Sequence, residues 1–195
     1  DDFPERVYKA IILYELHLRY YFQALLFTGF PHVHHTIGSA IAVKALPYVK
    51  SGGMNRKKAG EDFYFIQKMV PAGGFFNLYG TTVFPSPRSS SRVPFGTGVT
   101  VAKLAESEDP VLHTYNMQAF RELKSLFSLV EKLHSVDSED LYSIYMDLPP
   151  GLRSFIDIQE WTEKVAEIGS NTSGPASFRK RFFIWFNMFR IVKFL

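Results

Sequence analysis

The chain has 195 residues, a hydrophobic content of 46% and a net charge of +3, which together exclude a disordered protein. A charge this small does not favour nucleic acid as a partner. The absence of cysteine excludes disulfides and thiolate metal sites and fits a reducing compartment. No apolar run in the sequence is long enough to span a membrane, and the N-terminus does not resemble a signal peptide. Because the chain starts at Asp1 rather than at Met, we expect a segment of a longer protein.

A long amphipathic helix is predicted over residues 3–27. Apolar residues recur there at spacings of three and four, and the sequence Thr-Gly-Phe-Pro ends the pattern. His32, His34 and His35 follow, and this density suggests a metal site. No acid or cysteine lies beside them in the sequence to complete one. We therefore expect a polar loop, or a single substrate-contacting histidine at His35.

Two short strands are predicted, over residues 36–43 and 75–84. Both stretches are apolar and bounded by turn signals, and a short helix over 44–49 follows the first. We expect the strands to form a small sheet that the helices at 3–27 and 60–72 cover. The sequence therefore predicts an α+β fold that is mostly α.

A glycine pair and an acidic pair lie between the two strands. Gly52 and Gly53 predict a turn with positive φ. The helix that follows begins with Glu61 and Asp62, which the helix dipole stabilises. Asp62 shares a stripe with Ile66, so we expect it at the edge of a buried face, where an acid is costly unless it is paired or used. Helix capping and catalysis by an ionised Asp62 both stay open at this point.

Residues 85–98 form a predicted loop rich in proline, serine and arginine. Arg88 and Arg92 carry paired donors that suit phosphate. The alternative is a structured surface loop. The Phe-Gly-Thr-Gly at its end is too short to indicate a phosphate-binding glycine loop.

The rest of the chain is predicted to be helical. Helices are expected over residues 115–133, 140–146 and 152–168. Residues 178–195 carry five cations and no acid, with their apolar residues on a heptad-like stripe. This segment is either a helix that covers apolar surface of the domain, or an interfacial helix whose cations contact anionic lipid. We therefore divide the chain into residues 1–100 and a helical C-terminal extension, 101–195.

The stretches GSAIAVKA, SGGM and AGEDFYFIQK resemble, in this order, the second half of family-2 glycosyltransferases. Those are inverting enzymes with the GT-A fold. The loop PSPRSSSRVPFGTG resembles a bacterial branch of that group. The resemblance covers roughly residues 36–98 and implies that residues 1–100 are the acceptor-side part of a GT-A-like domain, which belongs to a hexosyltransferase-like enzyme.

The resemblance also implies roles for individual residues. Asp62 would be the general base that takes the proton from the acceptor hydroxyl, and Glu61 would orient the acceptor or the base. Gly52 and Gly53 would shape the acceptor side of the cleft. The arginines at positions 88 and 92 stand roughly where the family places basic residues near the leaving diphosphate, although the usual Gln-x-x-Arg-Trp form is absent.

The nucleotide-binding half of such an enzyme is not found in this sequence. No Asp-x-Asp precedes Gly38, and this motif holds the divalent metal, Mg or Mn, in the family. We therefore expect the metal and the nucleotide-sugar donor to bind outside this chain, which would be inactive or nearly so alone. The acceptor would be a glycan or a lipid-linked glycan. The location implied is cytoplasmic, with a peripheral position at the inner membrane through residues 178–195.

Two other functions compete with this one. The first is a non-catalytic module that docks on a membrane or a partner through the basic aromatic residues 178–195. The second is a metal-dependent hydrolase built on His32, His34, His35 and Asp62.

Overall fold

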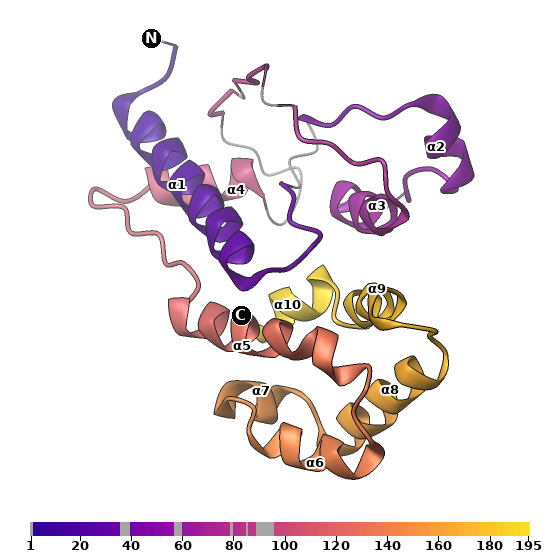
Figure 1. Cartoon of the computed structure of the whole chain (residues 1–195). Helices are drawn as coiled ribbons and strands as arrows, with labels where there is room; N and C mark the ends of the chain where they lie inside the picture. The colour runs from indigo at the N-terminus through magenta and orange to yellow at the C-terminus, as the bar shows by residue number, and fades with distance from the viewer. Residues whose placement is uncertain (1, 36–39, 57–59, 79, 85, 89–95) are drawn as a thin grey trace. The chain divides into compact units, whose positions relative to one another are not determined.

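The computed structural model describes residues 2–195 except for positions 36–39, 57–59, 79, 85 and 89–95. The described residues form helices joined by loops (Figure 1). The helices are α1 (Glu5–Thr28), α2 (Ala45–Lys50), α3 (Glu61–Met69), the 3-10 turn η2 (Val70–Ala72), α4 (Thr97–Ala105), α5 (Met117–Leu133), α6 (Ser138–Met146), α7 (Pro150–Phe155), α8 (Ile158–Ser170), α9 (Pro175–Trp185) and α10 (Met188–Phe194).

Residue contacts divide the chain into two compact units. Unit 1 comprises Asp1–Phe22 and His34–Thr114, and unit 2 comprises Gln23–Val33 and Tyr115–Leu195. Helix α1 therefore contributes residues to both units. Unit 2 is assembled from two stretches that are far apart in the sequence.

The predicted sheet, and with it the α+β, GT-A-like fold, is wrong for the part of the chain that the structure describes, which contains no β-strand. The described residues of 75–84 pair with no other strand, and the side chains of Phe76 and Phe84 are 80% and 89% exposed. A strand is stable only when it pairs with neighbours and buries one face, and local apolar alternation specifies neither. Residues 41–43 also lie outside regular structure, whereas 36–39 fall outside the described residues.

The helices expected in the first half of the chain are confirmed as α1, α2 and α3 with η2. Helix α4 was not predicted, because the Gly-Thr-Gly at its start is typical of a loop. Its Val101 and Leu104 pack with Ala10 of α1 in the core of unit 1, and Val101 and Ala10 are fully buried. Burial of this apolar side stabilises a short helix whose own sequence favours it weakly.

Two stretches predicted as single helices are each broken in two. The 152–168 stretch divides into α7 and α8, because Asp157 caps α8 by accepting from the backbone N–H of Gln159 (2.8 Å) and Glu160. The 178–195 stretch divides into α9 and α10, where Asn187 caps α10 in the same way. Each cap offers the backbone a helix start inside an apolar pattern that looks continuous.

The core of unit 2 is rich in aromatic side chains. Trp161 of α8 is fully buried and donates from Nε1 to the carbonyl oxygen of Leu141 at 3.0 Å, which joins α8 to α6. The apolar side of α9 faces this interior, and four phenylalanines there are at most 2% exposed: Phe178, Phe182 and Phe183, together with Phe186 beyond the helix end. Among the described helices, none combines the length and the apolarity needed to cross a bilayer.

Candidate functional site

The glycine turn of unit 1 has the conformation that the sequence requires. Gly52 and Gly53 have φ of +77° and +67°, in the left-handed region that favours glycine, so the predicted positive φ is confirmed. The turn closes α2, because Gly52 N–H donates to the Val49 carbonyl and Gly53 N–H to the Tyr48 carbonyl, each at 2.9 Å. These bonds satisfy carbonyls that the end of a helix leaves without partners.

Tyr48 and Lys68 fix this turn to α3. The Tyr48 hydroxyl accepts from Met54 N–H at 3.2 Å, and its ring packs against Phe65 of α3 with 5.4 Å between ring centroids. From α3, Lys68 Nζ donates to the carbonyl oxygen of Ser51 at 2.8 Å. The turn and the helix that carries the acidic pair therefore form one module, α2–turn–α3.

Asp62 lies in the first turn of α3, on the helix side that turns inward. Ile66, one turn later, is buried at 2% exposure, and Asp62 is half-buried, as the stripe predicted. Asp62 Oδ1 accepts from Phe63 N–H at 2.7 Å. The residue that precedes the helix is Gly60, which has a left-handed φ of +74° and no side chain to cap the helix. The positive end of the helix dipole therefore acts on the carboxylates of Asp62 and its neighbour Glu61.

The other predicted site residues that the structure describes, Arg88 and His35, show no contact with this module. Arg88 is exposed, and Arg92 lies outside the described residues. His35 stacks on Phe22 with 4.2 Å between ring centroids. Partial burial, and next the positive charge of Arg19, lower the pKa of His35. No hydrogen bond or ring contact among the described residues connects Arg88 or His35 to the acidic pair.

The histidine-rich stretch does not converge on one point. His34 is buried in unit 1 with its ring 5.5 Å from that of Phe75, whereas His32 belongs to unit 2 and contacts Phe30. The described residues bring no three histidine or acidic side chains close enough to hold a metal ion. The divalent metal that the resemblance implies is expected to bind outside this chain, and the hydrolase hypothesis finds no support among the described residues.

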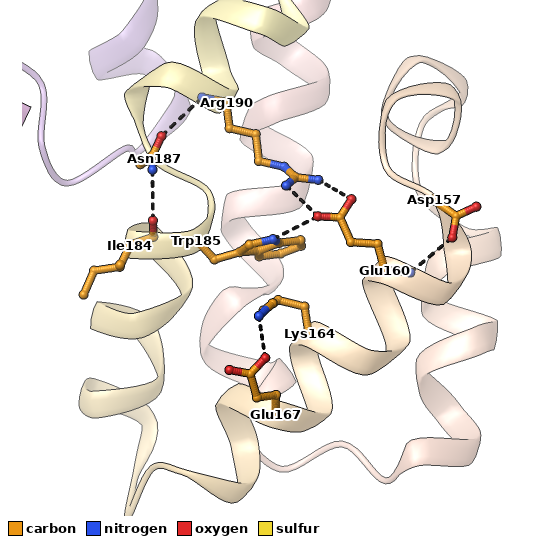
Figure 2. A network of polar contacts seen from close by, with 8 residues as sticks. All are labelled: Asp157, Glu160, Lys164, Glu167, Ile184, Trp185, Asn187 and Arg190. Atoms are coloured by element: carbon orange, nitrogen blue, oxygen red, sulfur yellow. Dashed lines mark hydrogen bonds and ion pairs between the residues drawn. The ribbon is translucent and has the colours of Figure 1, made fainter. Parts of the chain in front are cut away.

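Sequence reasoning missed a polar cluster in unit 2, drawn in Figure 2. Arg190 of α10 donates from its two terminal nitrogens to the two carboxylate oxygens of Glu160 of α8, at 2.6 and 2.7 Å. Trp185 Nε1 also donates to Glu160, and the Arg190 guanidinium lies 4.7 Å from a Trp185 ring centre. These bonds, chiefly the one from Arg190, lower the pKa of Glu160. The partners are 30 positions apart, so no local motif indicates the cluster.

A shallow pocket of about 390 Å³ also lies in unit 2. One of its walls is Glu122, which accepts from the backbone N–H of Leu152 at 3.2 Å and so caps the start of α7. The Glu122 carboxylate therefore has a structural role at the start of α7. The pocket is lined by Asn116, Gln118, Ala119, Glu122, Gly151, Ser154, Phe155 and Phe194.

Comparisons of the chain with protein-family models, with curated proteins and with solved structures give no match.

Proposed function

We propose that this chain is the acceptor-side part of an inverting glycosyltransferase, with Asp62 as the general base. The observation that carries the proposal is the α2–turn–α3 module: a strictly glycine turn is fixed to the helix whose first turn holds the acidic pair. The order of these parts is the one on which the family resemblance rests. The reaction is the one that the resemblance implies, and Asp62 of the module is the group that would accept the proton.

The proposed reaction needs one base. The acceptor hydroxyl oxygen forms a bond to the anomeric carbon of the nucleotide sugar, and its proton passes to the carboxylate of Asp62. The bond between the anomeric carbon and the diphosphate oxygen breaks, and the nucleoside diphosphate leaves with the electron pair. Attack opposite to the leaving group inverts the configuration. An alcohol is a weak nucleophile, so a positioned carboxylate contributes about 10²–10⁴ in rate.

The surroundings of Asp62 suit this role. The first-turn N–H of Phe63 holds Oδ1 in place, and the helix dipole favours the ionised form that a base needs. Among the described residues no hydrogen bond engages Oδ2, which is the oxygen we assign to proton transfer. Glu61, half-buried beside it, would orient the acceptor.

The test is Asp62→Asn in the complete enzyme, with sugar transfer and nucleotide-sugar binding measured separately. We expect kcat to fall by about 10²–10⁴ while donor affinity is unchanged. Asp140→Asn is the matched control, because Asp140 is an exposed acid in the first turn of another helix, α6. Residues 1–195 alone should transfer no sugar. If Asp62→Asn keeps the turnover of the Asp140→Asn control, Asp62 is not the base.

A further inference from the structure

On one face of unit 2, cationic side chains lie over aromatic rings. The segment Gln23–Val33 packs across α5 and α9, because the Phe30 ring lies 6.0 Å from Phe127 of α5 and 5.6 Å from Phe183 of α9. Lys124 Nζ of α5 lies 4.0 Å from the centre of the Phe27 ring. Arg179 of α9 lies over the Phe183 ring at 5.4 Å. Cation–π attraction holds both charges at this surface.

His32 belongs to the same cluster. Its ring contacts Phe30 edge-on at 5.7 Å, and Phe30 contacts the Phe183 ring that carries Arg179. Burial is the largest cause that lowers the pKa of His32, and the positive charges of Arg179 and Lys180 add to it. His32, Arg179 and Lys180 therefore lie close to one another on this face.

The outer side of α9 continues this cluster. The helix buries Phe178, Phe182 and Phe183, and on the opposite side Lys180, Arg181 and Ile184 are exposed. Ile184 is 51% exposed and lies one turn after Lys180. Neither α9 nor the segment Gln23–Val33 contains an acid. We call Lys124, His32, Arg179, Lys180, Arg181 and Ile184 the basic face.

No ion pair in the described part of unit 2 neutralises the charges of the basic face. In the part of unit 2 that the structure describes, no ion pair engages the four lysine and arginine side chains of this face. Glu122 of α5 caps α7, and Glu160 of α8 pairs with Arg190. The cations are therefore available to an anionic partner.

We propose that the basic face docks unit 2 on an anionic phospholipid surface. Charge complementarity requires a partner with many negative groups, and lysine and arginine near such a surface each add to the attraction. The exposed Ile184 among the cations, and Leu26 at 48% exposure in the crossing segment, suit insertion at the headgroup boundary. A nucleic acid would leave these aliphatic side chains without a partner. The contact is made by the outer side of α9, not by the phenylalanine stripe, which lies in the core.

The test is co-sedimentation of the full chain with vesicles of phosphatidylcholine alone or mixed with phosphatidylglycerol. We expect binding that requires the anionic lipid and weakens with salt. The double variant Lys180→Ala/Arg181→Ala should bind about 25-fold more weakly, since each cation contributes about fivefold. The matched control is Lys9→Ala/Lys103→Ala, which removes two exposed cations from unit 1. Circular dichroism is used to check that each variant is folded.

A further variant separates lipid from other polyanions. Ile184→Ser should weaken vesicle binding and leave the binding of a short RNA unchanged. The proposal is overturned if the folded chain does not bind anionic vesicles, or if the control loses as much binding as the double variant. It is also overturned if Ile184→Ser has no effect and the RNA competes fully with vesicles. None of these measurements requires sugar transfer, so the docking proposal and the proposed function can fail separately.

Discussion

Arg190→Met should lower the free energy of unfolding of unit 2 by about 2 kcal/mol. The substitution keeps an apolar stem and removes the guanidinium, which makes two charge-assisted hydrogen bonds to Glu160. Such bonds contribute up to about 3 kcal/mol when buried and about 0–1 kcal/mol when exposed. The Arg190 side chain is 20% exposed and that of Glu160 is 39% exposed, so we assign about 1 kcal/mol to the pair. The contact with the Trp185 ring adds about 1 kcal/mol.

The assay follows from where the tryptophans lie. The chain has two, Trp161 and Trp185, and both belong to unit 2. Tryptophan fluorescence during urea unfolding of the full chain therefore reports on unit 2. A double-mutant cycle of Arg190→Met with Glu160→Gln should give a coupling free energy of about 1 kcal/mol. Glu167→Gln is the matched control, because Glu167 is also on α8 but pairs with Lys164 at the surface, where we expect about 0.3 kcal/mol.

The stabilisation by the Glu160–Arg190 pair should also depend on pH and should weaken in acid. Because the folded-state pKa of Glu160 is lowered, chiefly by its bond from Arg190, the stabilisation is present above the unfolded value of about 4.3. It is lost as the pH falls through the folded-state pKa. The gap between the wild type and Glu160→Gln should therefore close in acid. A gap that stays constant with pH, or a coupling free energy of zero, would refute the role given to this pair.

Three further predictions concern single positions. Gly151→Ala places a Cβ 2.3 Å from Glu122 Oε2, so it should displace the Glu122 carboxylate from the Leu152 N–H that it caps. The fluorescence assay should show that unit 2 loses about 1–2 kcal/mol of stability. An unchanged stability would contradict the capping role of Glu122. Gly53→Ala forces a side chain into the left-handed region, and urea unfolding followed by circular dichroism should show a loss of about 1–2 kcal/mol. Vesicle binding should strengthen as the pH falls from about 7 to about 5, since protonated His32 adds a charge, and His32→Gln should remove this dependence; a dependence that persists would exclude His32 as its source.

The sequence predicted features that depend on local chemistry. The positive φ of Gly52 and Gly53 follows from glycine itself, and long apolar periodicity indicates α1 and α5 whatever they pack against. The breaks before α8 and α10 could also have been predicted from the sequence, because Asp157 and Asn187 are residue types favoured at helix N-caps.

Features that depend on distant residues could not be predicted in this way. The stretch 75–84 is apolar, as a strand would be, but a stable strand must pair with a neighbouring strand. None of the described residues supplies one. The pairing of Glu160 with Arg190 requires the turn between α9 and α10. The position of Arg88 relative to Asp62 is likewise set by tertiary structure, which spacing along the chain does not encode.

The two-stretch construction of unit 2 affects how the protein is made on the ribosome. Residues 23–33 are synthesised before α5 and α9, yet the Phe30 ring packs against Phe127 and Phe183, which emerge from the ribosome much later. All residues of unit 1 are available once Thr114 has left the exit tunnel, whereas Phe30 lacks its contact with Phe183 until α9 is translated. Until α9 is made, the nascent chain carries an aromatic segment whose packing is incomplete, the kind of segment that chaperones bind. A premature stop before α9 would leave the Phe30 ring without its partner Phe183 on that helix.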